Sequence, residues 1–268
     1  MQLPLNSYKK SRFLLKVYNK GRPKRRFSGN TTVSTESWLN FGAANNTNGV
    51  NTNKRMEISN TFDQIVSADK SATVFLNNDM GTAADTLFWG LSSRLIWVPV
   101  AIYFLYLIVV KRNYDWVMKA AIVLGLVITI TLCDQITSSI FKPLVARFRP
   151  SHDIEICAML HYVNNYHGGN YGFMSSHAAN AFGAAMLGAE IIRKRYFTIF
   201  LFSLATLVSY SRIYLGVHFL GDVVCGAIVG ITIAIIIHHL LKLLHGWLAF
   251  RSMRNTWMIK SEEAVVAA

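Results

Sequence analysis

Five stretches of apolar residues fill the second half of this chain, and they constrain its fold more than any other feature. They cover approximately residues 95–110, 117–141, 173–192, 197–211 and 219–241. A helix crosses a bilayer with about 20 apolar residues, and inside lipid only complete helices satisfy their backbone hydrogen bonds. We therefore predict an all-α integral membrane helical bundle with about five transmembrane helices.

The composition agrees with a membrane location. Hydrophobic residues make up 52% of the chain and charged residues only 15%, with a mean hydropathy of +0.31. Soluble domains carry about 25% charged residues. The three cysteines have no metal-ligand spacing, and two of them lie in apolar stretches. We expect neither a disulfide framework nor a zinc site.

Residues 1–55 differ sharply from the rest. They contain eleven Lys and Arg residues against Glu36 alone, so they carry +10 of the formal net charge of +13. They are rich in Asn, Ser and Thr without periodicity, and we expect a disordered segment with no nucleic-acid partner. A natural translation start near Met56 is an alternative that the sequence leaves open.

The rest of the chain divides into three parts. Residues 56–94 are predicted to be an amphipathic region that includes an interfacial helix over 83–91, where Trp89 suits the membrane surface. Residues 95–241 are the predicted membrane core. Residues 242–268 are predicted to be a cytoplasmic tail.

Unusual polar residues lie at the ends of these apolar stretches. Consecutive spans alternate in direction, so the end of the second, the start of the third, the end of the fourth and the start of the fifth emerge on one side. Those four ends hold Lys142, Arg147, Arg149 and Pro150, then Ser175, Ser176 and His177, then Ser211 and Arg212, then His218 and Asp222. Several cations, two histidines and one carboxylate should therefore meet near one membrane surface.

This set of side chains suits a phosphate. Lys and Arg are the usual ligands of phosphate oxygens, and Lys142 and Arg149, seven positions apart, share a face if that stretch is helical. His218 and Asp222 are four residues apart. A carboxylate there can bond one ring nitrogen and leave the other free to attack phosphorus. His177 remains to protonate the leaving oxygen.

The same residues resemble the three signature motifs of the type 2 phosphatidic acid phosphatase superfamily. The motifs are Lys142-x6-Arg149-Pro150, Ser175-Ser176-His177 and Ser211-Arg212-x5-His218-x3-Asp222. The resemblance covers about residues 85–241. It implies His218 as the nucleophile that forms a phosphohistidine, Asp222 as its orienting carboxylate and His177 as the general acid. It also implies Lys142, Arg149, Arg212 and Ser175 as phosphate ligands, with no metal and no cofactor.

One motif departs from the common form, which reads Pro-Ser-Gly-His. Here it is Met174-Ser175-Ser176-His177. The usual glycine lets a backbone N–H approach phosphate closely. Ser176 can still present its N–H at the start of a helix, so we count it among the phosphate-binding residues and expect activity with altered detail.

The resemblance implies a membrane enzyme that hydrolyses a lipid phosphate or diphosphate. Its expected partners are this substrate and the surrounding membrane lipids, and its oligomeric state is left open. Undecaprenyl diphosphate is the first expectation for the substrate. Phosphatidylglycerophosphate, phosphatidate and lipid A are alternatives. A vanadate-dependent haloperoxidase-like enzyme and an inactive lipid binder are alternatives from other classes. Asp134, inside the second apolar stretch, is interpreted as a structural hydrogen-bonding residue, and Arg147 as a loop or interface residue.

Basic residues in the short connectors predict the orientation. They lie on the side opposite the predicted site, and positive charge in short loops marks the cytoplasmic side. They are Lys111, Arg112, Lys119, Arg193, Lys194, Arg195, Lys242, Arg251 and Arg254. We therefore expect a protein of the bacterial inner membrane whose site faces the periplasm.

Overall fold

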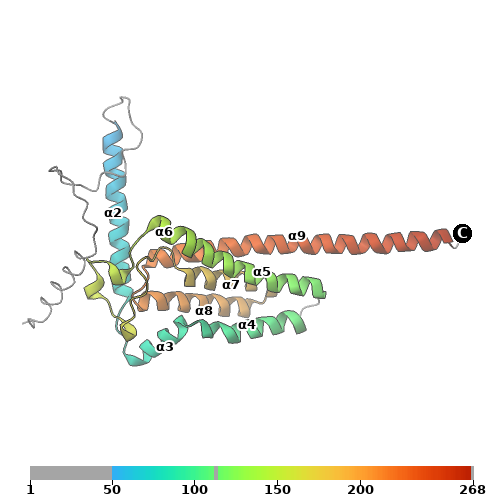
Figure 1. Ribbon diagram of the computed structural model, residues 1–268, viewed down its shortest axis with the longest axis horizontal. Helices are drawn as coiled ribbons and strands as arrows, with labels where there is room; N and C mark the ends of the chain where they lie inside the picture. Colours follow the sequence, from blue (N-terminus) through green and yellow to red (C-terminus); the bar gives the residue numbers. More distant parts are fainter. Residues whose placement is uncertain (1–49, 112–113, 267–268) are drawn as a thin grey trace, which may run out of the picture. The chain divides into compact units, whose positions relative to one another are not determined.

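Helices follow the apolar stretches in a computed structural model, which describes residues 50–111 and 114–266. The chain divides into two units, Met1–Lys54 and Arg55–Ala268. The predicted disordered segment therefore lies mostly outside the described residues. In chain order the helices are α2 (Val50–Leu76), α3 (Thr82–Ser92), α4 (Trp97–Tyr106), α5 (Trp116–Gln135), α6 (Lys142–Val145), α7 (Ser176–Ile192), α8 (Arg195–Tyr214) and α9 (Leu220–Val266) (Figure 1).

The prediction of an all-α membrane bundle is confirmed, whereas the count of five spans is not established. Three helical segments of the described chain are long and apolar enough to cross a bilayer: Trp116–Val145, Arg195–Tyr214 and Leu220–Asn255. A fourth span results if α3 and residues 97–110, which meet at a bend of 50°, act as one. Helix α7 has 17 residues, which is at the lower limit of a span. Helix α9 continues through most of the predicted tail.

Helix α5 changes its winding before it reaches α6. Residues Ile136–Phe141 form a π-helical turn, and α6 follows without a break in the chain direction. A π turn holds one residue more than an α turn of similar rise and often marks a functional site. Lys142 is the first residue after it.

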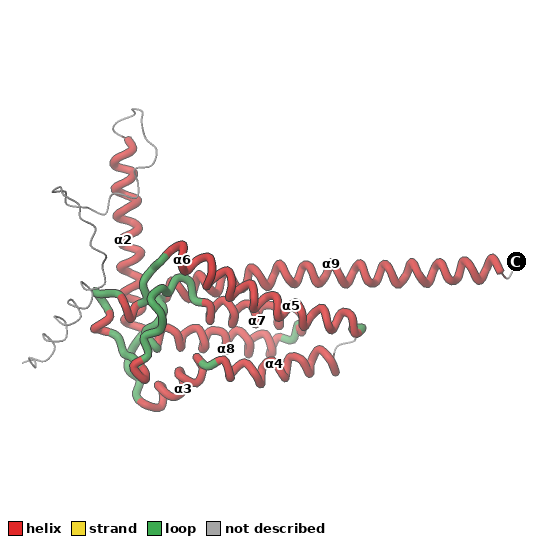
Figure 2. The backbone as a smooth tube through the Cα atoms, viewed as in Figure 1, coloured by secondary structure: helices red, strands yellow, loops and turns green. Residues whose placement is uncertain are grey.

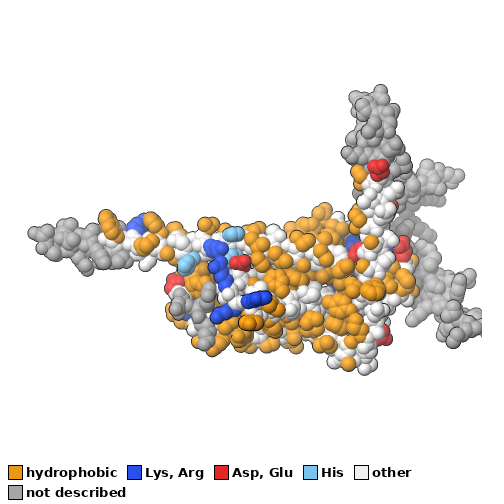
Figure 3. All heavy atoms as spheres, turned by 180° about the vertical axis from the view of Figure 1, so that it is seen from behind, with side chains coloured by type: hydrophobic (Ala, Val, Ile, Leu, Met, Phe, Trp, Pro, Cys, Tyr) orange, Lys and Arg blue, Asp and Glu red, His pale blue; other side chains and the backbone are white. Residues whose placement is uncertain are grey.

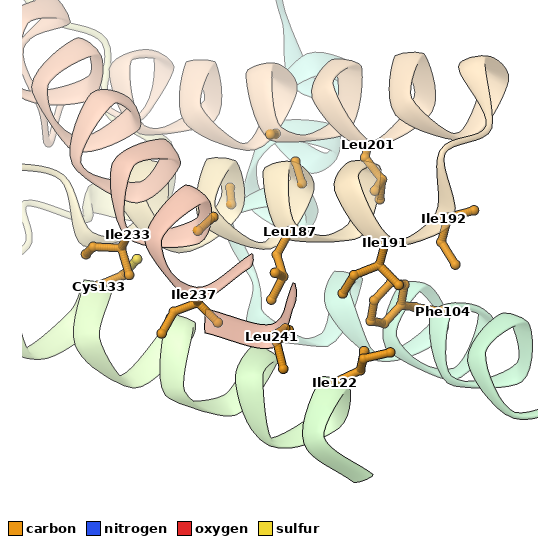
Figure 4. Close-up of a cluster of buried hydrophobic side chains, with 14 of the residues drawn as sticks. Phe104, Ile122, Cys133, Leu187, Ile191, Ile192, Leu201, Ile233, Ile237 and Leu241 are labelled. Atoms are coloured by element: carbon orange, nitrogen blue, oxygen red, sulfur yellow. The ribbon is translucent and has the colours of Figure 1, made fainter. Parts of the chain in front are cut away.

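Helix α7 lies among α5, α8 and α9 and is the centre of the bundle (Figure 1). Its Ala and Gly residues let the neighbouring backbones approach closely. A Cβ added at Gly226 of α9 would lie 2.5 Å from the Ser175 carbonyl oxygen, and one at Gly230 would overlap the carbonyl of Ala179. Below this contact, Leu187 and Ile191 pack into a buried apolar cluster with residues of α4, α5, α8 and α9 (Figure 4).

The end of the bundle that holds the start of α7 also holds the long loop between α6 and α7 (Figure 2). Helix α2 ends at this loop, where Asn77 is 4% exposed. The Asn77 side-chain amide donates to the carbonyls of His161, Ile213 and Tyr214, at 3.2, 3.0 and 2.6 Å. Its side-chain oxygen accepts from the His161 N–H at 2.6 Å. Asn77 thus joins α2, the loop and the end of α8.

Candidate active site

Three cations converge on this end of the bundle from separate parts of the chain. Lys142 begins α6, Arg149 follows the end of that helix, and Arg212 lies near the end of α8. Arg149 is 9% exposed and Arg212 is 4% exposed. Within the described chain, none of the three forms an ion pair with a carboxylate. Buried cations without counter-charges are costly, so their arrangement favours an anionic ligand.

Lys142 and Arg149 meet by a different route from the one that the sequence suggested. The helix does not continue from one to the other, because α6 ends at Val145 and Ala146 adopts a left-handed conformation, with φ 48°. The chain then turns back in an extended conformation at Arg149. The condition for a shared helical face is therefore not met, although both side chains line the same cavity.

Arg149 is held by the loop beside His218. Its Nε donates to the Tyr171 carbonyl at 3.2 Å, and its Nη1 donates to the Val217 carbonyl at 3.0 Å. The same Nη1 lies 3.2 Å from His218 Nε2. Burial lowers the pKa of the Arg149 guanidinium from its ordinary value, and the positive charge of Arg212 lowers it further. An anion between these cations would relieve both effects.

His218 and Asp222 form a buried pair at the start of α9. Their side chains are 2% and 0% exposed, and His218 Nδ1 lies 3.5 Å from Asp222 Oδ2. This separation is longer than that of a typical hydrogen bond. Asp222 Oδ2 also accepts from the backbone N–H of Phe219 at 3.0 Å. The ring therefore presents Nε2, and not Nδ1, toward Arg149.

The Ser-Ser-His motif starts α7. Ser175 is its N-cap, and the Ser175 hydroxyl accepts from the Ala178 N–H at 3.4 Å. Its own N–H donates to the Asp222 carbonyl at 3.0 Å, which joins α7 to α9. His177 is half-buried and lines the cavity.

The Ser176 hydroxyl contacts Lys142, a role that the motif comparison did not suggest. The Lys142 ammonium donates to Ser176 Oγ at 3.1 Å and to Ser138 Oγ at 3.3 Å. Thr137 Oγ1 donates to Ser176 Oγ at 2.8 Å. The serine that replaces the usual glycine therefore places the lysine at the cavity.

Replacing Ser176 with alanine should raise KM for a phosphorylated lipid about three- to tenfold, because Lys142 loses one neutral hydrogen-bond partner worth about 1 kcal/mol. Initial rates of phosphate release over a range of substrate fractions measure this change. Ser203→Ala is the matched control, since Ser203 is exposed on α8 and does not line the cavity. An unchanged KM in Ser176→Ala would contradict the role given to its hydroxyl.

The cavity has a volume of about 740 Å³ and combines two kinds of wall. Its polar end is lined by Lys142, Arg149, Arg212, Ser176, His177 and His218. Its other part is lined by apolar residues of four bundle helices, such as Phe104, Leu126, Ala184 and Leu201. Such a space can hold a phosphate at one end and hydrocarbon at the other.

The structure adds residues that the sequence motifs did not reveal. Ser92, at the end of α3, bonds Arg212 through its hydroxyl. The Tyr166 ring lies 5.9 Å from the Arg212 guanidinium and also lines the cavity. No spacing rule connects these positions with the motifs, because Tyr166 reaches the cavity through the folding of the long loop and Ser92 through the packing of α3 against α8.

Among the residues that the structure describes, Asp79, Asp85 and His161 form a group of possible metal ligands outside the cavity walls. His161 Nε2 lies 2.8 Å from Asp85 Oδ1, which also accepts from the Tyr214 hydroxyl at 2.7 Å. Hydrogen bonds thus account for the arrangement, and we assign no ion to it.

Comparison with known proteins agrees with the motifs. Residues 120–245 match the PAP2 superfamily. A lipid A 4'-phosphatase of Porphyromonas gingivalis is 35% identical over 173 residues, which cover 64% of this chain and 72% of that protein. The chain belongs to the PAP2 superfamily. The resemblance inferred from the motifs is confirmed. This chain is an integral membrane protein of a phosphatase family.

Two further proteins extend the comparison. A lipid A 4'-phosphatase of Bacteroides thetaiotaomicron is 37% identical over 163 residues, which cover 60% of the PAP2 chain and 72% of that protein. A crystal structure of a transmembrane PAP2-type phosphatidylglycerolphosphate phosphatase from Bacillus subtilis is also similar. The match covers 66% of this chain and 86% of the B. subtilis chain. Its TM-score is 0.51 at 20% identity, a level that supports the shared fold.

Proposed function

We propose that this protein removes a phosphate from a lipid A-type molecule, a phosphorylated sugar that carries acyl chains, through a phosphohistidine on His218. The observation that carries the proposal is the group of three cations, Lys142, Arg149 and Arg212, which face His218 without carboxylate partners in the described chain. A phosphate ester supplies the negative charge that this group lacks.

The first step transfers the phosphoryl group to the enzyme. His218 Nε2 attacks phosphorus, and the bond from phosphorus to the sugar oxygen breaks. His177 donates a proton to that oxygen as it leaves. The three cations stabilise the charge that spreads over the phosphoryl oxygens. Asp222, 3.5 Å from Nδ1, balances the positive charge that the ring gains.

The second step returns the enzyme to its starting state. A water molecule attacks phosphorus and gives a proton to His177, which is now the base. The bond between phosphorus and Nε2 breaks, and inorganic phosphate leaves. Each proton and electron pair is thereby returned.

Polar groups inside the cavity favour a sugar head group. Asp134, Gln135 and Asn180 line it beside the cation group. The side-chain oxygen of Asn180 is buried and has no hydrogen-bond partner among the described residues. Ionisable groups at membrane depth are costly and usually functional. Hydroxyl and amide groups of a sugar could bond them, whereas an isoprenyl chain could not.

The names of the two sequence relatives point the same way. Both are lipid A 4'-phosphatases. They favour the lipid A alternative over undecaprenyl diphosphate, the first expectation from the sequence.

The charge distribution supports a site on the outer side of the inner membrane. Figure 3 shows hydrophobic side chains over the bundle and Lys and Arg side chains gathered at the end away from α2. Lys194, Arg195 and Lys242 are exposed there. Positive charge near short loops favours the cytoplasmic side, which leaves the cavity on the periplasmic side.

A panel of substrates tests the proposal. Purified protein in detergent is given a lipid A bisphosphate, phosphatidate, phosphatidylglycerophosphate and undecaprenyl diphosphate at equal surface fractions, and phosphate release is measured. We expect kcat/KM to be at least about tenfold higher for lipid A, the effect of one or two extra hydrogen bonds. A preference for undecaprenyl diphosphate would refute the substrate, and release from none of the four would refute the function.

A further inference from the structure

A buried charge network connects α2 with the pair formed by His218 and Asp222. Arg147 Nη1 donates to Asp222 Oδ1 at 3.1 Å, and Arg147 Nη2 donates to Asp69 Oδ2 of α2 at 2.7 Å. The side chains of Asp69 and Arg147 are 14% and 24% exposed, and that of Asp222 is 0% exposed. The Arg147 guanidinium also lies 3.8 Å from the centre of the Phe219 ring.

Helix α2 also caps the N-terminus of α9. The first N–H groups of a helix have no partner within it. Here Asp69 Oδ1 accepts from the Gly221 N–H at 2.8 Å, and Thr73 Oγ1 accepts from the Leu220 N–H at 3.1 Å. Asp69 therefore makes two separate contributions, one to the backbone of α9 and one to Arg147.

The network determines which way the Asp222 carboxylate faces. Oδ1 is held by Arg147, while Oδ2 accepts from Phe219 and lies 3.5 Å from His218 Nδ1. A fully buried carboxylate needs a counter-charge. Arg147 supplies this counter-charge through Nη1. Asp69 in turn holds the Arg147 guanidinium in place by accepting a hydrogen bond from Nη2.

We propose that Asp69 and Arg147 are positioning residues that orient His218 through Asp222. Neither residue lines the cavity, so neither contacts substrate in this arrangement. Asp69 also lies outside residues 120–245, the part that matches the family. Helix α2 thus helps to position the residues of the active site. This inference rests on the proposed nucleophilic role of His218.

The first test is Asp69→Asn, because asparagine keeps an oxygen for the Gly221 N–H but removes the charge opposite Arg147. We expect kcat to fall about 10- to 100-fold, the range for outer-shell partners of metal-bound histidines. KM and the inhibition constant of inorganic phosphate should stay unchanged, because Lys142, Arg149 and Arg212 are untouched. The assay uses whichever lipid phosphate the wild type hydrolyses fastest.

A double-mutant cycle separates positioning from general stability. Asp69→Asn should have little further effect on kcat in an Arg147→Gln background, since both residues act on Asp222 along one path. Asp63→Asn is the matched control, because Asp63 is exposed on the same helix. It should behave as wild type. Thermal unfolding of each variant shows whether it is folded, and Arg147→Lys provides a milder change if Arg147→Gln is not.

The possible results are distinct. An unchanged kcat in Asp69→Asn, or an equal loss in both backgrounds, would overturn the positioning role while wild-type activity stands. A rise in KM with constant kcat would also overturn it, because it would place Asp69 in substrate binding. If the wild type releases phosphate from no lipid, the proposed function fails instead.

Discussion

Changing His218 to alanine is expected to lower phosphate release from a lipid phosphate by at least about 1000-fold, the scale seen when an enzyme loses its nucleophile. The ring is 2% exposed, with Nε2 beside Arg149 and Nδ1 beside Asp222. Alanine removes the atom that would bond phosphorus and leaves the three cations in place. Substrate should therefore still bind while transfer stops. Phosphate release and KM, or a binding constant where turnover is too slow, check both parts.

His239→Ala is the control for this experiment. His239 is exposed on α9, about five turns along the helix from its first residue, Leu220, and its loss should leave kcat within about twofold of wild type. A second measurement follows the intermediate. Alkaline quenching of the wild type during turnover should retain phosphate on the protein, and His218→Ala should retain none. Equal release by His218→Ala and wild type would rule out the mechanism.

Changing Gly230 to alanine is expected to have the largest effect on folding. The new Cβ would overlap the Ala179 carbonyl, so α7 and α9 would have to separate. Overpacking of this kind costs about 1–3 kcal/mol or more. Because Ser175, Ser176 and His177 are on α7 and His218 and Asp222 are at the start of α9, separation also disrupts the site. We expect a lower unfolding temperature and a lower kcat together.

Gly246→Ala provides a control of opposite sign. Gly246 is exposed on the same helix and has no atom within 4 Å of an added Cβ. Alanine should therefore stabilise the protein slightly, since it favours helix over glycine by about 0.5–1 kcal/mol. Unfolding in detergent, followed by intrinsic fluorescence, compares the two. Equal unfolding temperatures for both variants would show that the contact between α7 and α9 is not tight.

Most of the candidate site could be predicted from the sequence because consecutive membrane spans must alternate in direction. Alternating spans place the start of α7 near the start of α9, and the structure does bring His177 and His218 to one cavity. The same reasoning failed within the loops. Lys142 and Arg149 would share a face only if the stretch between them were helical, whereas α6 ends at Val145; the left-handed turn that follows leaves no periodic signal in the sequence.

The contribution of α2 could not be predicted at all. The motif leaves the position of Arg147 free and predicts only a loop or interface residue there, yet Arg147 bridges Asp69 and Asp222. Asp69 is 78 residues before Arg147 in the chain and has no distinctive sequence context. Pairings of this kind depend on how a surface helix docks, which apolar periodicity does not encode.

The π turn at Ile136–Phe141 accommodates one extra residue in this span without changing the direction in which Lys142 faces. An α-helix turns by about 100° per residue. If the same number of residues were wound as a regular α-helix, Lys142 would rotate by roughly that angle relative to Asp134 and the rest of α5. We therefore expect related chains that lack the wide turn to have one residue fewer between the positions of Asp134 and Lys142.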